Sequence, residues 1–400
     1  MLTGRVSPQG MPARVLLAFL ATAGFLYVNI MPALVDGLKQ GLAFTNKQAG
    51  LVGSFNVCGA ACGAFLIAFL VRRIPWRPAA RLLLLGLVAM DLISILVRNP
   101  YALMGARSLH GLAGGMLVGL AFSLIARTPS PDRTFGVLLL LQVLAGGLGV
   151  MSLPLLVPRF GTGILFASLI LFSLVTLSML RYLPDYPAPA RPPTAAGGRA
   201  VALKSRPLML ALLSVFFFQA ANMGLFAFII GLGEHHGLGL AFVSETLGIA
   251  NWLSIAGAIL VITLSTRHGI LWPILAGMTL SLVGTWALNY SGTKWIWIAA
   301  NVGTGITWNF VISHLLGVCA RFDRTGQAAV WSGFASKMGL ASGPLLASFM
   351  VGAGNYQALI ATALVLFVLA MFSSVIPARM LDRATVGADH VTVLDRSTAN

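Results

Sequence analysis

The residues of this sequence that are able to do chemistry lie mostly inside long apolar segments, and two of them are cations. Arg107 lies in a segment that runs from Tyr101 to Ile125, and Lys337 lies ten residues into a segment that begins at Gln327. A cation inside a bilayer costs from roughly 3 kcal/mol to far more, so such residues almost always face a protein interior or a water-filled cavity. Two cations that face one cavity would attract an anion such as a carboxylate. We therefore interpret Arg107 and Lys337 as candidate anion-binding residues.

Three further ionisable residues are candidates for carrying protons. Asp91 lies eight residues before Asn99 and Arg107 lies eight residues after it, so in a tight helical hairpin the two side chains lie at equal depth. Asp91 is then either a structural partner that allows Arg107 to be buried or a protonatable coupling group. His110 shares a helix face with Arg107 through its three-residue spacing and is able to titrate near neutral pH. His314 is a similar candidate, although histidines in packed helices more commonly serve as hydrogen-bonding groups.

Two acidic residues end apolar segments at equivalent positions. Asp36 follows the first segment and Glu234 follows the seventh, at a sequence offset that recurs elsewhere in the chain. Such acids are candidates for a gate at the outer mouth of a pathway or for proton uptake, although solvated carboxylates at helix ends are the commoner case. The neighbouring His235 and His236 have no further ligands nearby, so we expect no metal site.

Uncharged polar residues in apolar segments form a candidate recognition set. Its members are Tyr27, Asn29, Gln219, Asn222, Asn301 and Asn309. Amides are costly in lipid unless they face water, a ligand or one another. We therefore expect these side chains to line an interior and to bind a solute.

Composition assigns the chain to the membrane proteins. Of its 400 residues 58% are hydrophobic and 9% are charged, which excludes an ordinary water-soluble domain. The net charge of +16 does not indicate a nucleic-acid partner, because the Lys and Arg residues are scattered singly between apolar segments. No phosphate-binding loop of the form Gly-x-x-x-x-Gly-Lys-Ser/Thr occurs, so we expect no nucleotide cofactor and an energy supply from a gradient.

Apolar stretches of about 20 residues predict twelve transmembrane helices. They are expected to begin near Val15, Ala49, Leu82, Tyr101, Phe135, Ile164, Leu208, Val243, Leu271, Trp295, Gln327 and Tyr356. With the N-terminus inside, nineteen Lys and Arg residues fall on the cytoplasmic side and five on the outer side. This asymmetry favours an even number of crossings with both termini in the cytoplasm.

A stretch rich in Pro and Gly divides the chain into two halves. We expect a six-helix bundle over residues 1–183, a cytoplasmic linker over 184–207, a second six-helix bundle over 208–377 and a cytoplasmic tail over 378–400. The halves repeat, because the sequence Gly-Leu-Ala-Phe occurs at 41–44 and again at 239–242. Two parallel repeats imply a substrate site at their interface near the midplane.

The chain resembles the major facilitator superfamily of secondary transporters over essentially its whole length. Residues 107–111, Arg-x-x-His-Gly, resemble that family's fourth-helix pattern Arg-x-x-Gln-Gly, with His in place of Gln. Residues 339–344 resemble its Gly-x-x-x-Gly-Pro pattern, although in the eleventh segment rather than the fifth. The glycines at 111, 115 and 119 recur every fourth residue and predict a smooth face for close helix contact.

The sequence thus predicts a secondary active transporter that moves a small organic solute across the plasma membrane by alternating access. We expect the solute to be an organic anion and its transport to be coupled to protons. The alternatives are efflux of hydrophobic drug-like compounds and a non-transporting receptor or scaffold. An enzyme is not expected, because no nucleophile, base and orienting group occur together. The chain is expected to act as a monomer in the lipid bilayer, which in a prokaryote would be the inner membrane.

Overall fold

The computed structural model describes residues 6–71, 73–186, 206–264, 269–322, 327–352 and 354–397. In these ranges the chain forms α-helices and two short 3-10 helices, with no strand. Twelve helical segments are long and apolar enough to cross a membrane. The predicted all-α membrane fold with twelve crossings is therefore confirmed.

The helices follow one another with short connections. The first half contains α1 (Met11–Asn29), α2 (Met31–Leu42), α3 (Asn46–Leu70), α4 (Trp76–Leu96), α5 (Pro100–Ile125), α6 (Pro131–Phe160), α7 (Gly163–Met179) and η1 (Leu180–Tyr182). The second half contains α8 (Arg206–His235), α9 (Leu240–Leu253), α10 (Ile255–Leu264), α11 (Leu271–Ala287), η2 (Leu288–Tyr290), α12 (Lys294–Arg321), α13 (Gln327–Val351) and α14 (Tyr356–Ser397).

One helix break lies at the end of the first predicted crossing and another lies inside the eighth. α1 ends at Asn29 and α2 begins at Met31, with Pro32 in the first turn of α2, where the missing N–H of a proline is tolerated. The eighth crossing is interrupted at Ser254. The Ser254 hydroxyl donates a hydrogen bond to the backbone oxygen of Asn251 (2.6 Å) and so competes with the helix. Both breaks lie beside residues that line the cavity described below.

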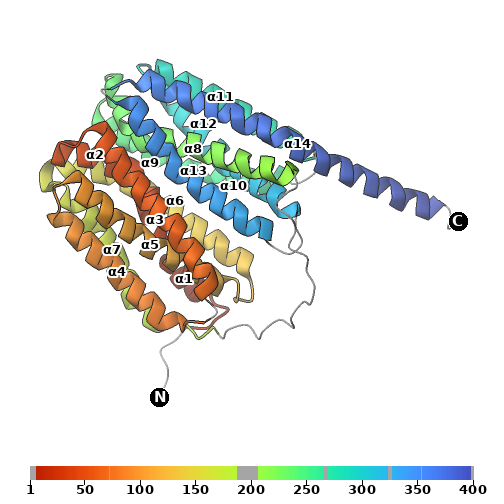
Figure 1. Ribbon diagram of the computed structural model, residues 1–400, viewed down its shortest axis with the longest axis horizontal. Helices are drawn as coiled ribbons and strands as arrows, with labels where there is room; N and C mark the ends of the chain where they lie inside the picture. The colour runs from red at the N-terminus through yellow and green to blue at the C-terminus, as the bar shows by residue number, and fades with distance from the viewer. Residues whose placement is uncertain are drawn as a thin grey trace.

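The helices form two groups that correspond to the two halves of the sequence. α1 to α7 pack mainly against one another, as do α8 to α14, and Figure 1 shows the red-to-yellow group beside the green-to-blue group. Two equivalent seams join the groups, because α3 packs against α13 and α6 packs against α9. A third contact joins α2 to α8. We call the end of the molecule that holds this contact the α2 end, and the end at which α1 and α8 begin the opposite end.

The predicted glycine face holds α3 against α5. A Cβ atom on Gly111 would overlap the backbone oxygen of Asn56, and one on Gly115 would overlap the backbone oxygen of Ala60. Residues without a side chain allow two helices to approach this closely. The contact therefore fixes the neighbours of Arg107, which lies one turn before Gly111 on α5.

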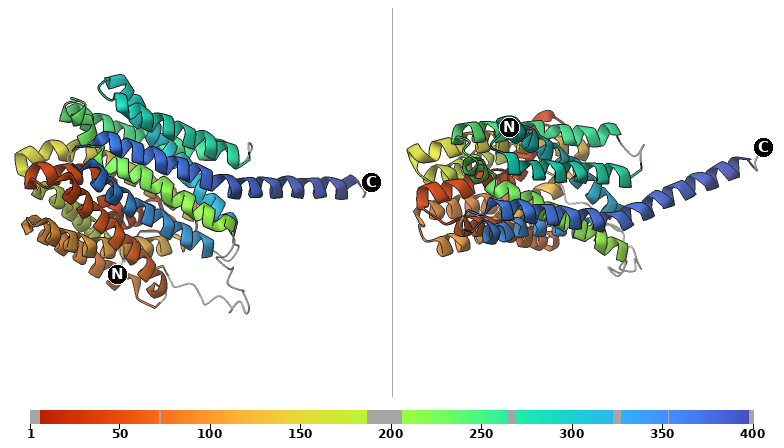
Figure 2. Two further views of the ribbon diagram at one scale, coloured as in Figure 1. Left: turned by 45° about the horizontal axis from the view of Figure 1, so that its top comes forward. Right: turned by 90° about the horizontal axis from the view of Figure 1, so that it is seen from above.

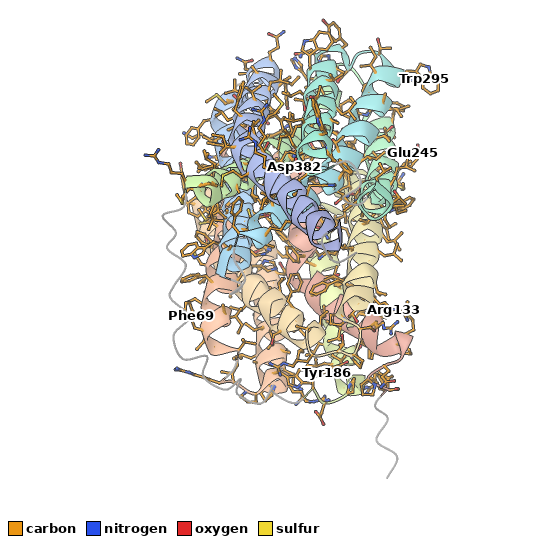
Figure 3. The ribbon with its side chains drawn as sticks, turned by 90° about the vertical axis from the view of Figure 1, so that its right-hand side faces the viewer. Phe69, Arg133, Tyr186, Glu245, Trp295 and Asp382 are labelled. Atoms are coloured by element: carbon orange, nitrogen blue, oxygen red, sulfur yellow. The ribbon has the colours of Figure 1, made fainter. Side chains whose placement is uncertain are left out.

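At the opposite end, α14 continues past residue 377 to Ser397 and projects from the bundle, as Figure 2 shows from two directions. Figure 3 views the molecule from this side, with Arg133 and Tyr186 on the first group and Asp382 on α14 of the second. The carboxylate of Asp382 accepts hydrogen bonds from the backbone N–H groups of Ile270 (2.7 Å) and Leu271 (3.1 Å). α14 therefore stabilises the start of α11.

Candidate functional site

A cavity of about 280 Å³ lies between the two groups of helices, lined by residues of α1, α6, α8, α9, α11, α12 and α13. Its polar lining residues are Asn29, Gln142, Gln219, Asn222, Asn251, Ser254, Thr285, Asn301, Thr304 and Asn309. Its aromatic lining residues are Phe25, Phe226 and Trp308. Among the described residues that line it there is no Asp, Glu, Lys, Arg or His. The cavity therefore offers uncharged hydrogen-bonding groups and aromatic rings.

Five members of the predicted recognition set line this cavity, namely Asn29, Gln219, Asn222, Asn301 and Asn309. Tyr27 does not, because its ring packs against the Arg107 guanidinium (4.6 Å) and near the His110 ring (5.8 Å). Sequence reasoning missed Gln142 and Asn251, which also line the cavity. Both are amides inside apolar segments, which is the same signal that identified the predicted recognition set.

Side chains in the lining and next to it also join the two groups. The Asn251 side-chain amide of α9 donates to the backbone oxygen of Val143 on α6 (3.2 Å), and the Trp252 indole donates to that of Leu144 (3.2 Å). The Gly147 position on α6 leaves room for the Trp252 indole, because a Cβ atom there would overlap the ring. Binding in the cavity is therefore close to bonds that break when α6 and α9 separate.

A hydrogen-bonded chain holds one aromatic wall of the cavity. The indole N–H of Trp308 donates to Oε1 of Gln219 (2.7 Å), and Nε2 of Gln219 donates to the hydroxyl of Ser336 (2.8 Å). The Trp308 ring also meets the Phe226 ring edge to face at 5.7 Å. This arrangement fixes an indole plane against which a bound solute can pack.

Arg107 lies away from the cavity in a fully buried ion pair. Its Nη1 donates to Oδ1 of Asp91 (2.6 Å) and to the hydroxyl of Ser94 (3.1 Å), and both charged side chains are 0% exposed. The rings of Tyr27 and Phe166 lie over the guanidinium at 4.6 and 5.3 Å. The equal depth inferred from the sequence corresponds to a direct contact. This contact fits the structural-partner alternative for Asp91, and its role as a coupling group stays an untested prediction.

His110 is held in one tautomer by the same network. Nδ2 of Asn56 donates to the backbone oxygen of Arg107 (3.0 Å), which only accepts, so this atom is a nitrogen and the amide is not flipped. The same Nδ2 lies 2.9 Å from Nδ1 of His110, which must therefore be the unprotonated ring nitrogen. The proton of a neutral His110 is then on Nε2, 3.5 Å from Oδ1 of Asp91.

Lys337 is separated from the cavity by one aromatic ring. Its Nζ lies 4.6 Å from the centre of the Phe25 ring, and Phe25 itself lines the cavity. Among the described residues no carboxylate lies within 4 Å of Nζ, in contrast to Arg107. His314 also lies outside the lining, where its Nδ1 donates to the backbone oxygen of Phe310 (2.9 Å).

Asp36 and Glu234 lie at the α2 end, where the two groups meet. Asp36 is 2% exposed, with Oδ2 accepting from Nε2 of Gln40 (2.7 Å) and Oδ1 without a hydrogen-bond partner in the described part of the chain. Burial raises the pKa of Asp36 to about 7, with nearby Glu234 adding to the rise and Lys39 opposing it. Glu234 is exposed, as expected for a solvated helix-end carboxylate, whereas Asp36 is not.

Groups of three or more metal-ligating side chains are absent from the described ranges.

A model of the Major Facilitator Superfamily matches residues 15–336 of the chain. No curated protein sequence matches it.

Solved structures resemble the fold over nearly the whole chain. The nucleoside transporter NupG has a TM-score of 0.76 at 12% identity, with 91% of this chain and 99% of that one covered. A bacterial homologue of the human lysosomal transporter Spinster, inward-facing and occupied, has a TM-score of 0.73 at 15% identity, covering 94% and 98%. A D-xylose–proton symporter has a TM-score of 0.71 at 13% identity, covering 90% and 96%. At these identities the likeness is one of fold.

Proposed function

The chain belongs to the Major Facilitator Superfamily of membrane transporters, and from that premise we propose that it moves a small uncharged organic solute through the cavity between its two groups of helices. It is a transporter rather than an enzyme. One observation carries the proposal, which is that every described side chain lining the cavity is uncharged. An ion stripped of water there would meet no opposite charge, which is costly. The nucleoside transporter and the D-xylose symporter named above take uncharged polar solutes, which supports the same class.

Transport in this proposal occurs by alternating access, with residues 1–183 and 208–377 moving as two bodies around the cavity. The contacts of α2 with α8 and of α6 with α9 are those that must part to open the α2 end. In this proposal the opposite end faces the cytoplasm and the protein lies in the plasma membrane, which the excess of Lys and Arg near that end supports.

Proton coupling is assigned in this proposal to Asp36 rather than to Asp91 or His110. Asp91 is committed to Arg107, and Nδ1 of His110 is occupied by Asn56. Asp36 is buried where the two groups meet and lies near Glu234, Lys39 and Tyr356. Separation of the groups would expose Asp36 to water and release its proton.

The test is uptake by the purified chain in liposomes with an acidic exterior. Labelled uridine and D-xylose serve as uncharged probes and benzoate as an organic anion. We expect uptake of at least one uncharged probe above that of protein-free liposomes and its loss on addition of a protonophore. Uptake of benzoate alone, or of no probe, would overturn the proposed solute class. Uptake that is unaffected by the protonophore but requires sodium would contradict proton coupling.

An organic anion remains the second candidate because of Lys337. Its ammonium group has no ion pair among the described residues and lies one ring away from the cavity. If the substrate is an anion, Lys337→Gln should abolish benzoate uptake. If the substrate is uncharged, the same substitution should leave uptake of uridine or D-xylose unchanged. Transport of a broad range of hydrophobic compounds would instead favour the drug-efflux alternative.

A further inference from the structure

The asparagine side chains of the cavity are oriented by the helices that carry them. Nδ2 of Asn222 donates to the backbone oxygen of Phe218 (2.9 Å), and Nδ2 of Asn301 donates to that of Trp297 (2.9 Å). Because a backbone carbonyl only accepts, the donating atom in each contact is a nitrogen and the amide orientation is not ambiguous.

Asn251 and Asn309 are oriented in the same way. Nδ2 of Asn251 donates to the backbone oxygen of Val143 (3.2 Å), and Nδ2 of Asn309 donates to both the backbone oxygen (3.1 Å) and the hydroxyl oxygen (3.0 Å) of Ser254. These four asparagines thus use their nitrogen on the protein itself, and the fifth asparagine of the lining, Asn29, does so through a longer contact with the backbone oxygen of Gln142 (3.5 Å).

Their oxygens are free. The Oδ1 atoms of these four asparagines accept no hydrogen bond from any described residue, and none is among the side-chain oxygens that are sealed off from solvent. An amide oxygen has two acceptor positions, whereas each of these nitrogens has at most one N–H left. The asparagines therefore present more acceptors than donors to the cavity.

The hydroxyl and indole groups of the lining reinforce this imbalance. The Thr304 hydroxyl donates to the backbone oxygen of Ala300 (2.8 Å), and the Ser254 hydroxyl donates to that of Asn251 (2.6 Å). The indole N–H of Trp308 is used on Gln219. Each of these three groups has spent its single hydrogen, so they offer a ligand oxygen lone pairs and the indole face. The side-chain amide of Gln142, which makes no hydrogen bond to a described residue, is the lining group that still has both of its N–H donors.

We propose that the solute is an uncharged compound with several O–H or N–H donors and one apolar face, in the manner of a cyclic polyol. This inference rests on the proposed function and specifies its substrate class. Donors on the solute would satisfy the asparagine oxygens, whose burial without a partner is costly, and the apolar face would pack on Trp308. A carboxylate has acceptors only and would meet mainly lone pairs in this lining. A cation would supply donors but would find no carboxylate in the lining and a like charge at Lys337.

The experiment measures binding without a gradient, as thermal stabilisation of the purified full chain. The probes are matched triads built on one scaffold each, such as myo-inositol, its fully O-methylated derivative and the polyhydroxy acid quinate, together with pentoses, nucleosides and their O-methylated and carboxylate counterparts. We expect stabilisation by at least one donor-bearing member and binding about tenfold weaker or more when its hydroxyls are methylated. Stabilisation mainly by ethers or carboxylates, or by no donor-bearing member, would overturn the proposal.

A pair of variants assigns the effect to the asparagine oxygens. Asn301→Leu removes one free acceptor and should weaken binding of the stabilising polyol about tenfold. Asn289→Leu is the matched control, because Nδ2 of Asn289 also donates to a helix carbonyl, that of Trp286, but the residue lies outside this cavity. Equal effects of the two variants would contradict the assignment. A polyol that binds but is never transported would refute the proposed function and leave this inference intact.

Discussion

Arg107 shows how the fold accommodates a charge inside the membrane. Its neighbours come from four other helices and are Tyr27, Asn56, Asp91 and Phe166. A buried pair is retained because removal of one partner leaves an uncompensated charge, even where replacement of both is nearly neutral. Three polar atoms of the pair have no hydrogen-bond partner among the described residues, namely Nε and Nη2 of Arg107 and Oδ2 of Asp91. The loss of the remaining contact between the two side chains would therefore leave the charge that stays with few hydrogen bonds.

Substitution of Asp91 alone should therefore be more damaging than substitution of the pair. We expect Asp91→Asn to lower the free energy of unfolding by about 3–5 kcal/mol, and the double change with Arg107→Gln to cost clearly less. Asp185→Asn is the control, because Asp185 pairs with Arg77 (2.9 Å) at a side chain that is 61% exposed, where a pair contributes about 0–1 kcal/mol. Thermal unfolding in detergent measures all three. A double variant as unstable as Asp91→Asn would contradict a structural role for the pair.

At the scale of the helices, tight contacts hold each group together. The closest approach in the first group is that of α5 to α3 at Gly111 and Gly115, and in the second group Gly339 and Gly343 of α13 bring it similarly close to α8. These contacts preserve the relative positions of helices within a group. The seams between groups combine close contacts, such as that of Gly147 with Gly248, with longer side chains, such as Lys47 over the Phe349 ring (4.5 Å).

Two glycines on α5 test this view directly. A Cβ atom on Gly111 would overlap the backbone oxygen of Asn56, whereas one on Gly105 would meet nothing within 4 Å. We expect Gly111→Ala to destabilise the protein by about 1–3 kcal/mol through overpacking. Gly105→Ala should be neutral or stabilising, because alanine favours the helix by roughly 1 kcal/mol. Equal melting temperatures for the two variants would show that the α3–α5 contact adapts without cost.

The sequence was informative about crossings and less so about faces. The predicted starts at Leu271, Gln327 and Tyr356 coincide with those of α11, α13 and α14, because hydropathy alone decides where a chain can span lipid. The sequence could not reveal that the Lys337 ammonium group packs on the Phe25 ring instead of lining the cavity. Helices that are apolar on every side carry no periodicity that marks the face toward the cavity. The interruption at Ser254 was also missed, because it depends on a local side-chain bond inside an apolar segment.

At the scale of the whole molecule, the α2 end links a proton to the separation of the two groups. Asp36 lies on α2, and Lys39 Nζ and the Tyr356 hydroxyl both lie over Gly231 of α8. With the groups in contact the pKa of Asp36 is about 7, and in water it would return to its ordinary value near 4. The closed arrangement therefore binds the proton more tightly. The bound proton's contribution to the stability of the closed arrangement is fully present below about pH 4. It falls as the pH rises toward 7 and is lost above that.

Distances between spin labels on Lys47 of α3 and Gln357 of α14 would measure this effect. We expect the population with long distances to grow between about pH 4 and pH 7, and Asp36→Asn to remove most of the dependence. Glu245→Gln is the control, because Glu245, labelled in Figure 3, is an exposed acid on a different helix, α9. A dependence that persists in Asp36→Asn, or that is lost in Glu245→Gln, would assign the proton to another group.

The ion pair between Arg107 and Asp91 also constrains how the protein is made. The two residues lie on consecutive helices, α4 and α5, which are joined by residues 97–99 alone. Neither helix can enter lipid by itself without a bare charge at its centre, whereas a hairpin inserts with the charge already neutralised. Biogenesis should therefore treat α4 and α5 as one unit, held beside the translocation machinery until both have been synthesised. Ribosome-bound chains in which α4 has emerged but α5 is still inside the exit tunnel should accordingly leave α4 accessible to cross-linking with that machinery, whereas chains long enough for Arg107 to have emerged should release it.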